Sequence, residues 1–261
     1  MNSGLSDVVK GFKNIRLPMF LAFADIRQRY RRSTLGPFWI TISTAIMIAC
    51  IGFIFGTIFK SPLKEFLPFL TAGLITWGFI TTTINDSTHV FVSAEPMVKQ
   101  LPMPLFTHVL RMVLKNVYIF LHNIVIFPFV CWIIDKEIGL NLLLFAPYLF
   151  LLIFNLLWVS LLLGIVCTRF RDLGQIVASL LQVAFYVTPV IWMPSLMPDR
   201  YSKWVLEINP FYQQLELIRC PLLNTIPANS AVIYSLCMCV VGWTLTLVVF
   251  NKYRDRIAYW L

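Results

Sequence analysis

Residues 36–59 read GPFWITISTAIMIACIGFIFGTIF, a run that contains no charged side chain. An α-helix needs about 20 apolar residues to cross the hydrocarbon core of a bilayer, so this run is long enough to span one. Further uncharged runs of similar length follow along the chain. The sequence therefore predicts a protein that crosses a membrane several times.

The composition supports the same fold class. The chain has 261 residues, of which 59% are hydrophobic and 13% are charged, and its mean hydropathy is +0.78. Soluble domains carry about 25% charged residues, so a globular protein in water would have too little polar surface to cover this chain. We expect an all-α polytopic membrane protein.

We expect six transmembrane helices inside a transmembrane domain at residues 35–251. Most of the 21 Lys and Arg residues fall in segments on the side of the N-terminus, which places both termini in the cytoplasm under the positive-inside rule. The net charge of +9 then reflects topology and contact with anionic lipid, and no nucleic acid is expected as a partner. The spans are predicted at about residues 36–59, 66–85, 110–134, 142–167, 173–194 and 230–250, between a cytoplasmic N-terminus at 1–34 and a cytoplasmic C-terminus at 252–261.

The segment before the first span predicts an interfacial helix. Met19, Phe23, Ile26 and Tyr30 recur at helical spacing within residues 18–33, with charged residues on the other face. The alternative is a plain positively charged anchor for the first span. No cleavable signal peptide is expected, because acidic and basic residues follow the short apolar stretch. The arginines that could reach phosphate headgroups are Arg27, Arg29, Arg31 and Arg32.

Residues 195–229, between the fifth and sixth spans, are predicted to form a re-entrant periplasmic helix pair. Prolines divide the segment into two amphipathic pieces, 199–208 and 211–220, and each is too short to cross the membrane. Such pieces are tolerated at membrane depth where protein or a water-filled cavity surrounds them. An ordinary external loop on the membrane surface is the alternative.

The amino-acid sequence contains no recognisable motif for catalysis or for energy coupling. The three histidines are scattered, the six cysteines suit small hydrophobic side chains, and no Gly-Lys dipeptide exists from which a phosphate-binding P-loop could be built. The centres of the spans also lack the charged residues that ion-coupled transporters need. We therefore expect no enzyme activity and no cofactor in this chain, and energy for transport would have to arrive through the cytoplasmic loops.

A polar strip on the fifth predicted span is the candidate channel surface. Gln175, Ser179, Gln182 and Tyr186 follow the spacing of one helix face. Uncharged amides, hydroxyls and rings suit a hydrated neutral polymer, whereas hydrogen bonding between helices of the bundle is the alternative interpretation. The candidate channel residues are Thr41, Thr44, Gln175, Ser179, Gln182, Tyr186 and Trp192.

Five stretches in order resemble one family. They are RQRYRRSTLGPFWITIS (27–43), RFRDL (169–173), TPVIWMP (188–194), INPFYQQLELIRCPLL (208–223) and RIAYWL (256–261). Together they resemble the ABC-2 type permeases that export polysaccharides, and most closely the O-antigen export permeases, with capsule and teichoic acid export permeases as cousins.

The resemblance implies a homodimer that binds two copies of a separate cytoplasmic P-loop ATPase, which would hold the ATP and Mg. The substrate would be a polysaccharide linked to undecaprenyl diphosphate, moved across the bacterial inner membrane. An ABC-2 permease that exports a drug or a small lipid is the alternative, and a membrane enzyme or scaffold is a third class.

The resemblance also implies roles for particular residues. Spans one and five would line the channel, and the arginines at 27–32 would belong to the interfacial helix. Our own hypothesis is that these arginines also receive the diphosphate of the substrate. Coupling to the ATPase would fall to Glu95, Pro96, Lys99, Arg169, Arg171 and Asp172. The gate helices would carry Trp204, Phe211, Tyr212 and Leu215.

Overall fold

Helices account for all regular secondary structure in the part of the chain that the structure describes. This computed structural model describes residues 3–29, 31, 36, 38–59, 62–194 and 206–261. Within these ranges it has no strand, so the all-α prediction is confirmed. The helices are α1 (Ser3–Lys13), α2 (Arg16–Arg29), α3 (Phe38–Phe59), α4 (Leu63–Ser87), α5 (Val90–Ser93), α6 (Glu95–Gln100), α7 (Leu105–Asn123), α8 (Ile126–Ile133), the 3-10 helix η1 (Leu140–Leu144), α9 (Phe145–Arg169), α10 (Leu173–Val187), α12 (Pro210–Leu222) and α13 (Asn229–Trp260).

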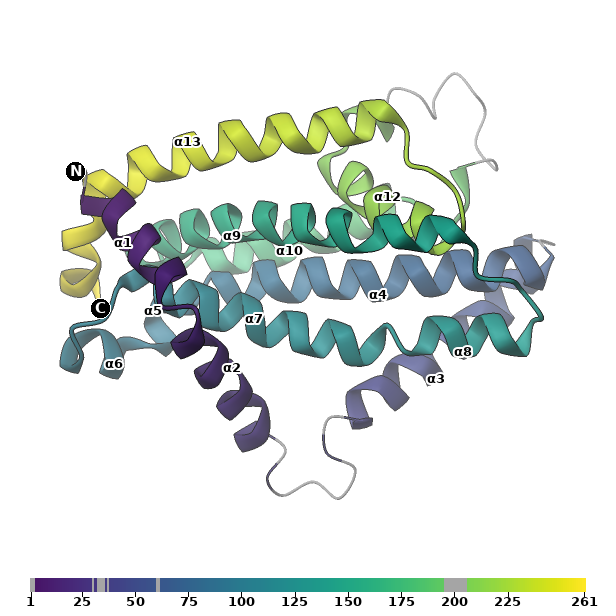
Figure 1. Cartoon of the computed structure of the whole chain (residues 1–261), viewed down its shortest axis with the longest axis horizontal. Helices are drawn as coiled ribbons and strands as arrows, with labels where there is room; N and C mark the ends of the chain where they lie inside the picture. Colours follow the sequence, from purple (N-terminus) through teal and green to yellow (C-terminus); the bar gives the residue numbers. More distant parts are fainter. Residues whose placement is uncertain (1–2, 30, 32–35, 37, 60–61, 195–205) are drawn as a thin grey trace.

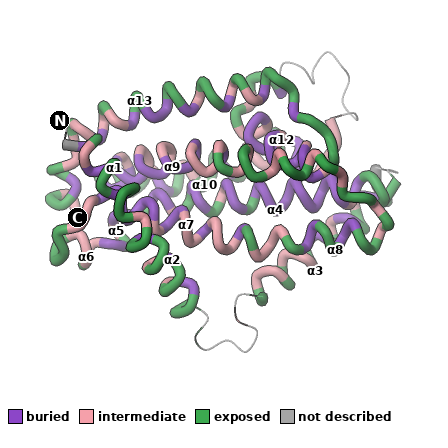
Figure 2. Tube along the Cα trace, in the orientation of Figure 1, coloured by how far each residue is buried: buried purple, intermediate pink, exposed green. Residues whose placement is uncertain are grey.

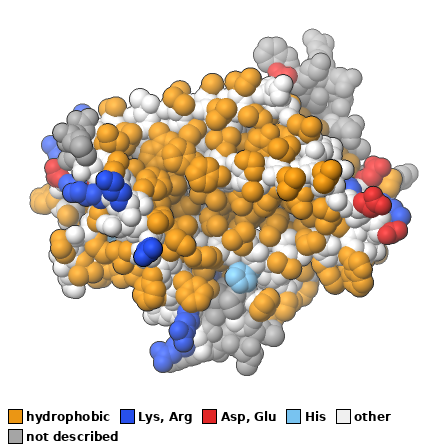
Figure 3. All heavy atoms as spheres, in the orientation of Figure 1, with side chains coloured by type: hydrophobic (Ala, Val, Ile, Leu, Met, Phe, Trp, Pro, Cys, Tyr) orange, Lys and Arg blue, Asp and Glu red, His pale blue; other side chains and the backbone are white. Residues whose placement is uncertain are grey.

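Five helical segments among the described residues are long and apolar enough to cross a membrane. In Figure 1 they run roughly side by side along the long axis of the molecule. Figure 3 shows hydrophobic side chains over the middle of the visible face, with charged side chains gathered toward the two ends. The five segments are Phe38–Ile58, Leu63–Ser87, Leu105–Ile133, Leu140–Arg169 and Asn229–Trp260.

The fifth predicted span, at residues 173–194, contains a helix that is shorter than the prediction. Its helix α10 has 15 residues and ends at Val187, which at about 1.5 Å per residue is shorter than the hydrocarbon core. The cause is local, because Thr188 precedes Pro189 and adopts an extended conformation with φ −85° and ψ 134°. The chain then continues without a regular helix to Met193.

The third predicted span, at residues 110–134, consists of two helices in succession. The helix breaks after Asn123 and resumes as α8 at Ile126. Pro128 lacks the N–H that would bond one turn back, so the helix is weakened at this point. At the other end of the chain, α13 continues unbroken through the predicted C-terminal segment to Trp260.

Helix α2 packs on the bundle through one narrow stripe and leaves part of its predicted apolar face accessible. It ends at Arg29, and its buried residues are Pro18, Ala22 and Ile26, whose spacing forms one stripe. This stripe is set by packing against α7. Met19 and Phe23, which we expected on the same face as Ile26, are 42% and 58% exposed.

Helix α12 lies inside the bundle rather than on its surface. It packs against α4, α9 and α13, and most of its residues from Gln213 to Leu222 are buried. Its start is fixed by Asn209, whose side-chain oxygen accepts hydrogen bonds from the N–H groups of Phe211 and Tyr212. The first piece of the predicted helix pair falls largely outside the described residues.

The core of the bundle forms around α4, most of which is buried in Figure 2. One hydrophobic cluster surrounds α4, and a second joins α7, α9 and α13 near the termini. Gly4 donates its N–H to the side chain of Asn251 over 2.7 Å, and both termini lie at the same end of the bundle in Figure 1. Helix α10 starts at that end too, after the short turn that follows α9.

Candidate functional site

The polar strip of α10 lies on the exposed side of that helix. Gln175, Ser179 and Gln182 are exposed, and Tyr186 is 64% exposed. The buried residues of α10 occupy the opposite face, as Gly174 and Leu181 do. The four polar side chains therefore share one accessible face, as their spacing predicts.

An apolar groove of about 880 Å³ runs beside this strip. Leu180 and Val183 line it from α10 and are 62% and 61% exposed. Val159 and Leu163 of α9 and Phe211 of α12 line its other sides. The accessible surface of α10 is thus polar along the strip and apolar along the groove. Such a surface suits contact with water on one side and with apolar groups on the other.

The remaining predicted channel residues are less exposed to solvent than the strip on α10. Thr41 is half-buried and donates its hydroxyl to Asn123 on α7 over 3.2 Å. Thr44 is half-buried on the same helix. Trp192 donates its indole N–H to the carbonyl of Tyr186 over 3.2 Å, so it folds back on the end of α10.

The predicted gate residues that the structure describes sit on α12 at the end of the bundle away from the termini. Phe211 meets the ring of Trp77 at 5.5 Å between centroids, and Leu215 is fully buried. Tyr212 is half-buried. Trp204 lies outside the described residues.

Arg219 on the same helix is a functional candidate that the sequence reasoning missed. It falls in the second piece of the predicted helix pair, 211–220, where we assigned it no role, whereas its side chain is 1% exposed. It pairs with Glu216, donates to the carbonyl of Pro189 over 2.7 Å, and lies 4.0 Å above the ring of Phe69. A signal was present, because the apolar residues three and four positions away mark the buried face of α12.

These contacts connect α12 to the irregular segment after α10. Arg219 reaches Pro189 there, and Asn209 donates to the hydroxyl of Thr188 over 2.9 Å. Two polar anchors therefore hold α12 against the residues at which the α10 helix ends.

The predicted coupling residues lie at the end of the bundle that carries the termini (Figure 1). Lys99 and Glu95 form an ion pair of 2.7 Å on α6. The hydrogen bond and charge of Lys99 lower the pKa of Glu95, and the charge of Arg171 adds to this effect. Helix α6 also lies against α13.

The other predicted coupling residues are also accessible. Pro96, Arg171 and Asp172 are exposed. Arg169 is exposed and lies 5.8 Å from the ring centroid of Trp260, so the turn after α9 meets the end of α13. The two predicted coupling segments thus form an accessible surface beside the C-terminus.

The predicted headgroup arginines begin at the exposed end of α2. Arg27, Arg29 and Arg31 are exposed. Arg32 lies outside the described residues. Among the described residues, no cluster of His, Cys, Asp and Glu has the arrangement of a metal site.

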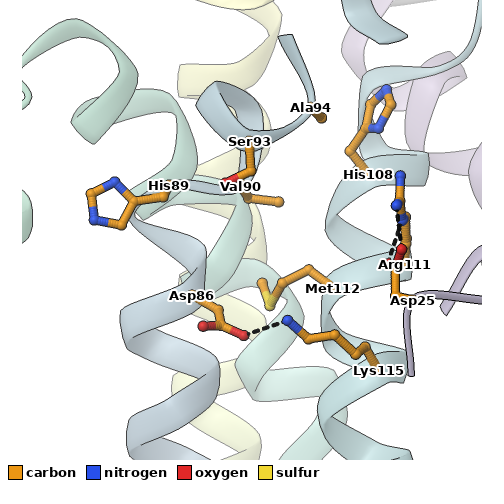
Figure 4. A pocket seen from close by; sticks show the side chains of 10 residues that line it. All are labelled: Asp25, Asp86, His89, Val90, Ser93, Ala94, His108, Arg111, Met112 and Lys115. Carbon is orange, nitrogen blue, oxygen red and sulfur yellow. Dashed lines mark hydrogen bonds and ion pairs between the residues drawn. The ribbon is translucent and has the colours of Figure 1, made fainter. Parts of the chain in front are cut away.

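A polar cavity of about 380 Å³ opens between α2, α4 and α7 (Figure 4). Arg111 of α7 donates two hydrogen bonds to the carboxylate of Asp25 on α2, at 2.6 and 2.5 Å. One turn along α7, Lys115 pairs with Asp86 of α4 at 2.8 Å. Both cations fall in the predicted third span, 110–134, and their acidic partners lie 86 and 29 residues away in the chain.

The sequence is similar to known membrane transport proteins. The family model described as ABC-2 type transporter matches residues 19–223. An O-antigen export system permease protein RfbA of Klebsiella pneumoniae is 24% identical over 240 residues, which cover 90% of each chain. A protein of the same name from Myxococcus xanthus is 21% identical over 187 residues, covering 71% of this chain and 72% of the relative.

Proposed function

Because the chain belongs to the ABC-2 type transporter family, as a membrane permease and not as the ATPase, we propose that it exports a polysaccharide. The proposed substrate is an O-antigen-type polymer linked to undecaprenyl diphosphate, which crosses the bacterial inner membrane. Distant relatives that carry the name of O-antigen export permeases support this choice of substrate. ATP hydrolysis in a separate subunit supplies the energy.

The exposed strip on α10 is the observation that carries the proposal. Gln175, Ser179, Gln182 and Tyr186 offer amides, hydroxyls and a ring without a formal charge on one accessible face. Sugar hydroxyls can exchange hydrogen bonds with such groups, and no fixed charge holds the polymer in place. A neutral polymer can therefore slide along the strip one residue at a time.

A second copy of the chain is part of the proposal. Only 11% of the most apolar part of α3 is buried within one copy, and α10 also has a wide exposed face. A homodimer that brings these two helices together from both copies would enclose a channel and cover polar groups that lipid cannot satisfy.

The proposed path begins and ends at features already described. The arginines at the end of α2 would attract the diphosphate at the cytoplasmic side, where both termini lie in this proposal. The coupling surface formed by α6 and the α9–α10 turn would receive two copies of the ATPase. Helix α12, with Phe211 and Tyr212 near its start, would close the periplasmic end.

Enlarging a side chain on the strip tests the proposal. Replacing Gln182 by Phe should lower surface polysaccharide about tenfold, because the larger apolar ring narrows the path. Copurification of the second copy and of the ATPase should persist. Val183 supplies the matched control, because it is the next residue, is 61% exposed and belongs to the apolar half. The change Val183→Phe should leave polymer export within about twofold.

Export of a small lipid or a drug is a second candidate, which the apolar groove beside the strip favours. The same two variants separate the candidates. If the groove carries the cargo, Val183→Phe will impair export of the lipid or drug and Gln182→Phe will not. Equal surface polymer in wild type and in Gln182→Phe would contradict the polysaccharide proposal.

A further inference from the structure

Helix α6 is held on the bundle by few contacts. It has six residues, from Glu95 to Gln100, and none of them is fully buried. One of its polar contacts reaches a spanning helix, because Arg111 of α7 donates to the sulfur of Met97 over 3.0 Å. Because α6 is so little buried, a partner can reach it, and the contact with Arg111 links it to α7.

The guanidinium of Arg111 binds a second helix at the same time. Its Nε and one terminal nitrogen grip both oxygens of Asp25, at 2.6 and 2.5 Å, while the other terminal nitrogen faces Met97. The planar fork of arginine is suited to this bidentate contact. The two side chains of the pair are only 21% and 25% exposed, so water screens their attraction less than at an open surface.

Asp25 is in turn part of a helix that reaches away from the bundle. Helix α2 packs on α7 through Ala22 and Ile26, and it exposes Phe20 and Phe23 at 70% and 58%. Exposed aromatic rings on a helix beside membrane spans suit the boundary between headgroups and acyl chains. Any displacement of α2 would therefore be a displacement within the membrane interface.

We propose that Arg111 is a positioning residue that makes α6, α7 and α2 move as one body when the ATPase acts on α6. The inference rests on the proposed function, since it takes α6 as the receiving segment and α2 as the interfacial helix. Movement of the ATPase would then be carried to the point where the lipid-linked substrate enters. Lys115 has a separate role, because it ties α7 to Asp86 of α4 (Figure 4).

Reversing the charges of the pair tests this role in the full transporter, with its ATPase bound in lipid. Arg111→Asp and Asp25→Arg should each keep ATPase copurification and hydrolysis, while export of polymer per ATP falls about tenfold or more. The double variant Arg111→Asp/Asp25→Arg restores the pair between α7 and α2 but leaves Met97 without a donor, so export should recover only in part, to about a third of the wild-type level. Lys115→Gln removes an ion pair of similar exposure and should retain the wild-type ratio of export to hydrolysis.

The outcomes are distinct. Single variants that export at the wild-type ratio would overturn the inference, and so would a double variant that recovers no export. If the wild-type transporter itself moves no polysaccharide, the proposed function is wrong, but the inference about Arg111 is not yet refuted. A distance measurement then decides the inference.

Distances within an otherwise intact chain provide that measurement, even where the charge variants fail to fold. Spin labels at the exposed residues Gln28 and Gln100 report on α2 and α6, after exposed Cys50 and Cys237 are changed to serine. When nucleotide is trapped in the ATPase, the Gln28–Gln100 distance should stay constant within about 2 Å. The distance from Gln100 to a label at Asn229, at the far end of the bundle, should change. A change in the first distance, or no change in either, would refute coupled movement.

Discussion

Replacement of Arg219 by methionine should destabilise the protein strongly. Methionine keeps much of the apolar stem but removes every hydrogen-bond donor. The carbonyl of Pro189 would then be buried without this partner, and the carboxylate of Glu216, which is 20% exposed, would lose its ion pair. The contact with the ring of Phe69 would lose its positive charge as well.

The expected size of the effect follows from these contacts. An unsatisfied buried carbonyl costs about 1–3 kcal/mol, and breaking a buried ion pair by removing one partner costs about 3–5 kcal/mol. Part of Glu216 is reached by solvent, so we expect a loss of about 3 kcal/mol, near the lower limit of that range. For a chain of this size, such a loss lowers the melting temperature by roughly 6–12 °C.

Thermal unfolding of the purified protein in detergent, followed by tryptophan fluorescence, measures this change. The double variant Glu216→Gln/Arg219→Met removes the stranded carboxylate and should recover about half of the loss. Lys99→Met breaks the pair with Glu95, whose side chains are 47% and 38% exposed, and should leave the melting temperature almost unchanged, because exposed ion pairs contribute little to stability. An Arg219→Met protein that melts within about 1 °C of wild type would refute the reasoning.

Two further predictions concern packing and charge. A Cβ on Gly242 would overlap the ring of Trp158, so Gly242→Ala should cost about 1–3 kcal/mol in thermal unfolding, whereas Gly78→Ala, with no neighbour within 4 Å, should not destabilise. Lys99 lowers the pKa of Glu95, so the pair stabilises the fold above the unfolded-state pKa of Glu95 and is lost as pH falls through the folded value. NMR titration of the Glu95 carboxyl should give a higher midpoint after Lys99→Met, and an unchanged midpoint would contradict the pairing.

The boundary of α10 could have been predicted from the sequence. Pro189 disfavours a helical conformation for Thr188 and so ends the helix at Val187. Hydropathy alone extended the predicted span beyond this point, because it counts apolar residues and ignores backbone geometry. The turn signal was local and was available without the structure.

The burial of Arg219 could be predicted only in part from the sequence. Its apolar neighbours on α12 indicate a buried face, but the partner that makes burial tolerable is the carbonyl of Pro189, 30 residues away. Every residue has a backbone carbonyl, so the sequence does not indicate which carbonyl will accept the hydrogen bond. We therefore assigned this charge no partner.

The amino-acid sequence by itself determined that this chain is an all-α membrane protein and that α10 carries a polar strip. Both properties follow from short-range periodicity and from the length of the apolar runs, which act before any tertiary contact forms. Only the tertiary structure decided that Arg111 meets Asp25, which is 86 residues away in the chain. An ion pair depends on where helices are placed in space, and neither partner's neighbours in the sequence specify that position.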